Sequence, residues 1–429
     1  MARRLNTTQS DFTAAFDALL NQSRGTVEDV RADVEVIIAG VRNGGFSALS
    51  KYTDQFDNFQ LSPGNARVSE AEFAEAESAC EDAALEALDF AAQRITAFHQ
   101  KQLPVDVRYT DEAGVELGWQ WTSVDAAGLY VPGGRAAYPS SVLMNAIAAK
   151  TAGVSRLAMT TPATGGDINP LVLAAARRAG VDEVWKIGGA QAVAALAFGA
   201  DPIAPTDVIV GPGNAYVAEA KRQVFGIVGI DSIAGPSEIL VVADADNDAD
   251  WIAADLLSQA EHDPSSQSIL ITDDDDFADA VSDAAASQIG ESPRKEITNA
   301  AWSQNGAIIV VDKLDMAPAL VNQIAPEHLE LATADPNALM IKIKHAGAIF
   351  LGRHTPEAIG DYVAGPNHVL PTSRAARYAS GLSVLNFMKR STIMRCDAAA
   401  LNAVGPTAAR LADAEGLTSH AHSIRVRLK

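Results

Sequence analysis

Apolar residues in the first hundred positions recur at the spacing of a helix. One such stripe runs over residues 30–41 and is expected to end at the glycine pair 44–45, because glycine favours helix ends over helix interiors. Residues 69–72 have the Ser-x-x-Glu spacing of a capping box, which predicts the start of a helix that reaches His99. Residues up to about 102 therefore read as helical, and we interpret His99 as a structural residue.

From residue 128 the pattern changes to short apolar runs, glycine loops and alanine-rich segments in alternation. Residues 129–131, 183–187 and 207–210 read as strands, and each leads into a glycine loop that is followed by a helix. This βαβ order predicts a parallel sheet with helices on its faces. Ligands of such sheets bind at the carboxyl ends of the strands, where these glycine loops lie.

A second series of the same kind begins near residue 238. Apolar runs at 239–242, 268–271 and 307–311 are expected to be strands, and the segment from residue 318 to about 331 is expected to be helical. Two sheet domains of similar construction are thus predicted side by side. A site between them would draw loops from both.

The end of the chain has a different character. Beyond Leu382 there are too few apolar positions for a separate core, although residues 402–414 are expected to form a helix. A tail of this kind usually packs onto another domain or onto a partner subunit. We therefore expect this segment to depend on contacts outside itself.

Composition narrows the class of protein and of ligand. At 429 residues the chain is long enough for at least two cores. Its formal net charge of −21 disfavours nucleic acid and anionic membranes as partners and suits a cationic small molecule.

No apolar run approaches the roughly 18 residues of a membrane span, and the basic start of the chain lacks the apolar stretch of a signal peptide, so we expect a cytoplasmic protein. Cys80 and Cys396 form no CxxC pattern, so a metal would need nitrogen and oxygen ligands.

The first candidate for chemistry is the end of a predicted helix near residue 260. Asp263 precedes Pro264, and a residue before proline is pushed out of the α region, so the helix should end there. Gln259 and His262 are three residues apart and share a face of the last turn, where both could converge on one ion or substrate. The alternative is a solvated glutamine beside a histidine that the helix dipole favours.

Three further polar clusters follow along the chain. They are Glu327-His328, the segment from Asp361 to His368, and the segment from Glu415 to His420. Singly, each reads equally well as a solvated helix surface, a cap or an end of the tail. Together they supply the residue types of a zinc site with mixed ligands and an open position, with a glutamate and a histidine left for acid and base work.

The glycine loops give a weaker signal. Gly211-Pro212-Gly213-Asn214 follows a strand and opens a helix, but it lacks the third glycine of a full dinucleotide fingerprint. Structural turns explain this loop and those at 133–134 and 188–189 equally well.

The chain resembles the histidinol dehydrogenases over nearly its whole length. The resemblance rests on many separated motifs in the family's order, which makes chance similarity implausible. The motifs are GLYVPGG at 128–134, IGGAQA at 187–192, VGPGN at 210–214, AGPSE at 234–238, QAEH at 259–262, APEHLE at 325–330, GDY at 360–362, GPNHVLPT at 365–372 and EGLTSH at 415–420.

The resemblance implies a zinc- and NAD-dependent oxidoreductase of histidine biosynthesis, which oxidises L-histidinol through L-histidinaldehyde to L-histidine. One zinc ion per subunit would be held by Gln259, His262, Asp361 and His420. Contacts with NAD are implied for Tyr130, Gln191 and Asn214. The implied substrate contacts are Ser237, Glu327, His328, Glu415 and the four zinc ligands.

The resemblance also implies an α/β fold with two incomplete Rossmann-like parallel-sheet domains. We assign residues 1–104 to a helical N-terminal region, 105–127 with 237–381 to a first domain that carries metal and catalytic residues, 128–236 to a second domain that contacts NAD, and 382–429 to a C-terminal helical arm. The family forms homodimers with intertwined arms. Glu415 and His420 are therefore expected to reach the neighbouring subunit's site.

The expected mechanism needs a base for each hydride loss and a way to add water to the aldehyde. We assign the base to His328 and water activation to Glu327. Relatives in the wider family oxidise a sulfonated diol, an anion that should demand Arg or Lys where this chain has carboxylates. The same residue types would also serve a zinc hydrolase, or a structural zinc in a nucleotide-binding scaffold.

Overall fold

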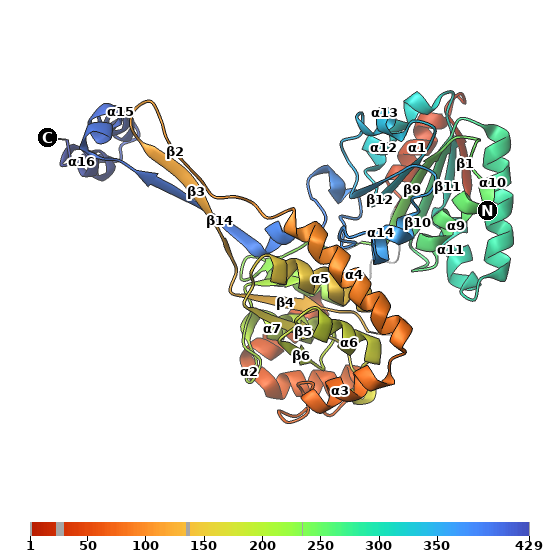
Figure 1. The fold of residues 1–429 in the computed structure, drawn as a ribbon, viewed down its shortest axis with the longest axis horizontal. Coiled ribbons are helices and arrows are strands. Elements are labelled where there is room, and N and C mark those ends of the chain that lie inside the picture. The colour runs from red at the N-terminus through yellow and green to blue at the C-terminus, as the bar shows by residue number, and fades with distance from the viewer. Residues whose placement is uncertain (1, 23–29, 134–137, 234, 429) are drawn as a thin grey trace.

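The structure is a computed structural model that describes residues 2–22, 30–133, 138–233 and 235–428. Gly134 and Ala234, which belong to two of the motifs above, lie outside the described residues. Figure 1 shows two halves, each built on a sheet with helices around it, and a long arm that projects from one half and carries the C-terminus. The predicted fold class is confirmed: α/β with two parallel sheets, N-terminal helices and a C-terminal helical arm.

One half contains a six-stranded parallel sheet in the order β1-β11-β10-β9-β12-β13. Successive residues of β9 alternate between two cores, so that Ile239 and Val241 pack on one face while Leu240 and Val242 pack on the other. The strands are β1 (Arg3–Asn6), β9 (Glu238–Ala243), β10 (Gln267–Thr272), β11 (Ala307–Val310), β12 (His328–Ala332) and β13 (Ala348–Leu351). The helices are α1 (Phe12–Leu20), α9 (Ala249–Ala260), α10 (Asp275–Glu291), α11 (Lys295–Asn305), α12 (Ala317–Ile324), α13 (Pro336–Met340) and α14 (Glu357–Tyr362).

The other half contains a five-stranded parallel sheet in the order β6-β5-β4-β7-β8. Its two faces are covered by separate apolar cores, as expected for a sheet made of βαβ units. The strands are β4 (Ala126–Tyr130), β5 (Arg156–Thr160), β6 (Glu183–Trp185), β7 (Val208–Val210) and β8 (Gly229–Ile230). The helices are α2 (Arg31–Asp57), α3 (Glu70–Ala79), α4 (Asp82–Gln100), α5 (Pro139–Thr151), α6 (Pro170–Arg178), α7 (Gly189–Phe198) and α8 (Ala215–Val224).

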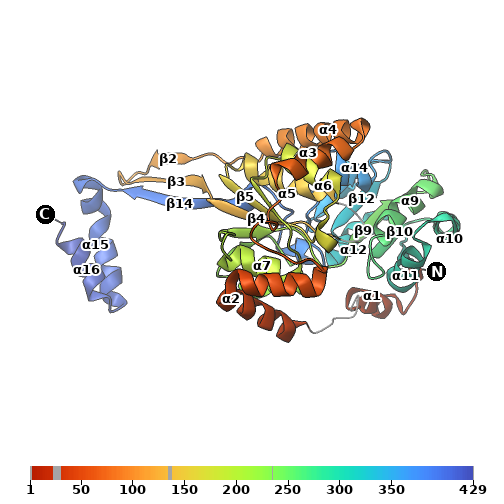
Figure 2. The same cartoon turned by 90° about the horizontal axis from the view of Figure 1, so that it is seen from below.

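The arm is an antiparallel three-stranded ladder that ends in two helices, and both views show it extended away from the two halves (Figures 1 and 2). The Arg390 guanidinium lies over the rings of Trp119 and Trp121, at 5.8 and 5.9 Å from their centroids, which stiffens the ladder. The elements are β2 (Val107–Thr110), β3 (Glu116–Ser123), β14 (Met388–Arg395), α15 (Ala398–Ala414) and α16 (Thr418–Arg425).

Two segments pair differently from the division expected above. Residues 107–123, which belong to the first Rossmann-like domain in that division, form the ladder of the arm, in which β3 pairs with β14. Apart from the buried Gly118, the residues of these strands are half-buried or exposed, which an antiparallel ladder tolerates but a parallel strand covered on both faces does not. Near the N-terminus, β1 joins the edge of the six-stranded sheet instead of forming a helix. The other domain boundaries stay a prediction.

The helix predicted from residue 318 to about 331 is present, but it is shorter than expected. Helix α12 ends at Ile324, and Ala325 takes a left-handed conformation with φ of 50° immediately before Pro326. A residue that precedes proline is disfavoured in the α region, so the helix cannot continue. The chain then enters strand β12 at His328, and all five residues of that strand are buried.

Two predicted helix boundaries also differ in detail. The capping box at Ser69 and Glu72 is confirmed, but that helix ends at Ala79 and a second one, α4, carries the chain to Gln100. Helix α2 continues past the glycine pair 44–45, with a kink at Gly45, where φ is 54°. Among the described residues, no helix combines the length and the apolar character that crossing a bilayer requires.

Candidate active and metal site

The candidate catalytic residues lie at the amino ends of strands in the six-stranded sheet. His328 is the first residue of β12 and is in register with Ile239 of β9, and Glu327 directly precedes the strand. Gln259 lies in the last turn of α9, which returns to the same edge before β10 begins. In this half the site therefore occupies the edge opposite to the carboxyl edge that usually binds ligands.

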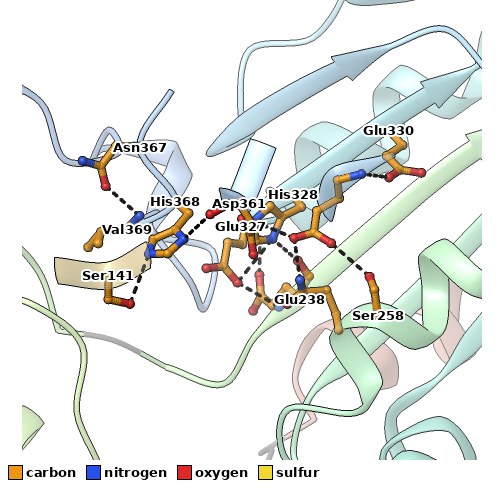
Figure 3. Close-up of polar contacts among 12 residues, drawn as sticks. Ser141, Glu238, Ser258, Glu327, His328, Glu330, Asp361, Asn367, His368 and Val369 are labelled. Carbon is orange, nitrogen blue, oxygen red and sulfur yellow. Dashed lines mark hydrogen bonds and ion pairs between the residues drawn. The ribbon is translucent and has the colours of Figure 1, made fainter. Parts of the chain in front are cut away.

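Glu327 and His328 are fixed by the backbone of the neighbouring strand (Figure 3). The Glu238 N–H donates to Glu327 Oε2 at 2.9 Å, and the Glu327 N–H donates to Glu238 Oε2 at 3.3 Å. His328 Nδ1 lies 2.9 Å from the Glu238 carbonyl oxygen. Because a carbonyl oxygen only accepts, Nδ1 carries the hydrogen, and in the neutral ring Nε2 carries the lone pair.

The other ring nitrogen of His328 faces a group of carboxylates. Nε2 lies 3.5 Å from Asp361 Oδ1 and 3.7 Å from Glu357 Oε1, and it has no hydrogen-bond partner among the described residues. Ligand atoms of these three residues all lie within 4.8 Å of one another. A buried nitrogen without a partner beside two carboxylate oxygens is a donor set that fits a divalent cation.

Gln259 is oriented toward this group by Glu357. Its Nε2 donates to Glu357 Oε1 at 2.7 Å, and the hydroxyl of Ser258 donates to Glu357 Oε2 at 2.9 Å. Gln259 and Glu357 are each 2% exposed, so this contact is shielded from water. With its amide nitrogen engaged, Gln259 keeps its carbonyl oxygen as a possible metal ligand. His262 lies just beyond the helix and is exposed at the rim.

Burial and the neighbouring charges together set the pKa values of Glu327, His328 and Asp361. Burial raises the pKa of Glu327 to about 8. Burial alone would lower the pKa of His328, but the carboxylates of Glu327, Asp361 and Glu357 outweigh it and raise that pKa to about 10. Burial would raise the pKa of Asp361, but the imidazole of His328 lowers it to about 2. The group thus favours a cation, and a metal among these carboxylates would compete with the proton on His328.

The residues predicted to contact NAD meet at one edge of the five-stranded sheet. Tyr130 is the last residue of β4, and its hydroxyl accepts the Gly189 N–H at 3.1 Å. Gln191 is buried in the first turn of α7, and Asn214 caps α8 by accepting the Val217 N–H at 3.2 Å. This edge is the carboxyl edge, where the sequence placed the glycine loops.

A short segment after Asp361 links the two halves through Asn367 and His368, to which the sequence assigned no individual role. The side chain of Asn367 donates to the Met144 carbonyl in α5 at 2.7 Å. His368 lies between the Ser141 hydroxyl, at 3.2 Å from its Nε2, and the Asp361 carbonyl, at 2.9 Å from its Nδ1 (Figure 3). The predicted ligand Asp361 is thereby tied to the half that carries the NAD residues. The matched GPNH motif was the only sequence signal for this link.

Two predicted site residues are not brought to this site within one chain. Glu415 ends helix α15 and His420 lies in α16, both exposed on the arm far from the sheets (Figure 1). Ser237 directly precedes β9, and its backbone carbonyl accepts from the Gln267 N–H at 2.9 Å. The structure therefore gathers Ser237, Gln259, Glu327, His328 and Asp361 at one edge, with His262 at its rim.

Comparison with known proteins identifies the family of the chain. The model of the family described as histidinol dehydrogenase matches residues 20–428. The chain is 61% identical to the histidinol dehydrogenase of Rhodospirillum rubrum over 429 residues, covering 100% of this chain and 99% of the relative. It is 57% identical to that of Ruegeria pomeroyi, with 100% and 99% covered. A crystal structure of histidinol dehydrogenase from Elizabethkingia anophelis superposes with a TM-score of 0.95 at 35% identity, covering 100% of this chain and 98% of that one. On these findings the chain belongs to the histidinol dehydrogenase family.

Proposed function

We propose that this chain oxidises L-histidinol in two steps, through L-histidinaldehyde to L-histidine, as the last reaction of histidine biosynthesis in the cytoplasm. The observation that carries the proposal is the buried Glu327-His328 pair, which faces Gln259 and the Asp361 carboxylate in a chain that matches its family from end to end. A net negative site of this kind suits an amino alcohol that carries positive charge.

The proposed metal is zinc, and of the group around His328 that suits a cation, the Asp361 carboxylate would be its ligand. Gln259, His262 and Asp361 of one subunit would hold the ion together with His420 of the partner subunit. Zinc bound there would orient the imidazole and amine of histidinol, which is a positional role more than a polarising one. Glu357 would hold Gln259 in the orientation that exposes its carbonyl oxygen.

The proposed hydride acceptor is NAD, which takes up one hydride in each of the two oxidations. Tyr130, Gln191 and Asn214 would bind it at the carboxyl edge of the five-stranded sheet. The substrate's carbinol carbon would then lie between this edge and the amino edge of the other sheet.

The proton steps belong to His328 and Glu327. His328 is anchored through Nδ1, and in its neutral form it would take the hydroxyl proton at Nε2 as each hydride leaves the carbon. Between the two oxidations the aldehyde must add water to become a diol. Glu327, held by the Glu238 N–H, removes a proton from that water. Ser237 and Glu415 would complete the contacts with the substrate.

The proposed assembly is a homodimer in which each arm completes the other subunit's site. The support is the position of Glu415 and His420 on an extended arm, together with exposed apolar side chains on that arm at Met394, Leu411 and Val426. Such side chains gain by burial against a second copy.

Subunit mixing tests the exchange of arms. H328N and H420N are each expected to be inactive as homodimers. In an equal mixture about half of the dimers carry one chain of each kind, and one of their two sites then combines an intact His328 with an intact His420 of the partner subunit. About a quarter of wild-type activity should return. If His420 served its own subunit, the mixture would stay inactive.

The overall reaction is tested by counting NADH against L-histidinol with the zinc-loaded protein. About two NADH per histidinol, abolished by a chelator and restored by zinc, are expected. A yield of about one NADH per histidinol would contradict the water-activating role of Glu327. None would refute the proposal and would make a sulfonated diol the next substrate to test.

A further inference from the structure

A buried ion pair lies beside the loop that follows β7. Lys221, in helix α8, pairs with Asp231, which directly follows β8, and their side chains are only 2% and 4% exposed. Removing two charges from water costs more than their mutual attraction commonly returns, so a pair of this kind is weak evidence of stabilisation. The hydrogen bonds of the two side chains with the backbone indicate a different role for the pair.

Both charged groups hold the backbone of one residue, Gly211. Asp231 Oδ2 accepts the Gly211 N–H at 2.8 Å, and Lys221 Nζ donates to the Gly211 carbonyl at 2.9 Å. Gly211 has φ of 113°, and a Cβ at this position would lie 2.1 Å from the Tyr130 carbonyl oxygen. Gly211 is therefore fixed on one side by the ion pair and on the other by the end of strand β4.

The held residue begins the loop 211–214, which leads into the helix that carries Lys221. The loop is closely fitted, because a Cβ on Gly213 would lie 2.4 Å from Val217 Cγ1. Its last residue, Asn214, caps α8. Strand β7, the loop, helix α8 and the segment after β8 are thus closed into one unit by the ion pair.

We propose that Lys221 and Asp231 are positioning residues for NAD: by holding Gly211 at both its N–H and its carbonyl, they set the place of Asn214 and of the α8 N-terminus. The inference rests on the proposed function, in which Tyr130 and Asn214 contact NAD. Loss of the ion pair should weaken the binding of NAD and leave the histidinol and metal sites, which lie in the other half, unchanged.

The informative variant is the double substitution K221M/D231L. It removes both charges and both hydrogen bonds to Gly211 but keeps apolar volume, and such replacements of buried pairs are often neutral for stability. K221M alone would leave the Asp231 carboxylate buried and unpaired, which destabilises the fold. A weaker binding of NADH could then come from unfolding instead of from the lost contact with Gly211. The Kd for NADH is measured by fluorescence on the metal-free protein, and KM is then measured separately for NAD and histidinol.

We expect the Kd for NADH and the KM for NAD to rise about tenfold in the double variant, as the loss of a well-placed hydrogen bond would give. The KM for histidinol, the zinc content and the melting temperature should stay close to wild type. L173A, which opens a cavity in α6 on the opposite face of the same sheet, is the matched control for destabilisation. It should lower the melting temperature without changing the Kd for NADH.

A double variant that binds NADH as tightly as wild type would overturn the inference. If it does not fold, K221M/D231N gives the decision: it removes both charges but keeps an acceptor for the Gly211 N–H, and it should raise the Kd for NADH by a smaller factor, while an unchanged Kd would again overturn the inference. A wild-type protein that does not bind NADH would refute the proposed function itself. If the wild-type protein binds NADH and the double variant has the same Kd, only the proposed role of the ion pair is refuted.

Discussion

Glu357 offers a direct test of the proposal that Gln259 is a metal ligand. Glutamine is a weak ligand, and among the described residues the Gln259 amide is oriented by its contact from Nε2 to Glu357 Oε1 at 2.7 Å. Both side chains are buried, so water does not compete for the contact, and burial raises the pKa of Glu357 to about 7. When Glu357 is ionised, the contact is a charge-assisted hydrogen bond. We expect E357A to release the Gln259 amide and to weaken zinc binding.

The size of the effect follows from that single contact. A hydrogen bond to a charged group contributes about 1.5–3 kcal/mol, which corresponds to about a 10- to 100-fold loss of zinc affinity. The affinity is measured by competition with a chromogenic chelator. S258A is the matched control, because it removes the other hydrogen bond to Glu357 without touching Gln259. It should change zinc affinity by less than E357A does.

E357Q separates two possible roles of this residue. A glutamine at 357 still offers an oxygen to the Gln259 amide but lacks the charge of a carboxylate ligand. If Glu357 only orients Gln259, E357Q should bind zinc more tightly than E357A does. If Glu357 is itself a ligand, as its place beside His328 and Asp361 would allow, both variants should lose zinc alike. Wild-type zinc affinity in E357A would refute the whole line of reasoning.

Three further predictions concern other residues of the site. E327Q should slow the second oxidation more than the first in single-turnover measurements. Equal slowing of both oxidations would contradict the water-activating role of Glu327. H420N should lose zinc, measured by atomic absorption, together with activity; a fully metallated and active variant would remove His420 from the ligand set. N367L should lower the free energy of unfolding in urea by about 1–3 kcal/mol, because it removes the buried hydrogen bond to the Met144 carbonyl, and an unchanged midpoint would show that this contact is dispensable.

The sequence predicted the two sheets well because their strands carry a strong local signal. Strands β9 and β10 are buried at every position, and each contains an apolar run, residues 239–243 and 269–271. Strand β12 carries no such signal, since the run His328-Leu329-Glu330 contains a histidine and a glutamate. Both are buried in the fold, and tertiary contacts rather than local propensity decide their conformation.

The polar contacts of the site were beyond prediction because they join residues far apart in the chain. Gln259 and Glu357 are 98 positions apart, and Ser141 and His368 are 227 apart. Glu357 carries no motif of its own and reads as an ordinary acidic residue near the start of a short helix. Only the fold brings it to 2% exposure beside Gln259. The resemblance supplied the ligand set, and the structure adds the residue that orients one member of it.

At the proposed site one half presents the C-terminus of a helix and the other half presents the N-termini of two helices. These helix ends carry partial charges of opposite sign, which suit a cationic substrate and an anionic dinucleotide. On the substrate side the C-terminus of α9 lies at Gln259, and the partial negative charge of a helix C-terminus favours a cation. On the proposed nucleotide side the N-termini of α7 and α8 lie at Gly189 and Asn214, where the partial positive charge of a helix N-terminus favours phosphate. A cationic alcohol and an anionic dinucleotide would thus each meet helix ends of opposite sign. The segment from Asp361 to His368 ties the two edges together, because it bears a predicted metal ligand at one end and bonds to α5 at the other.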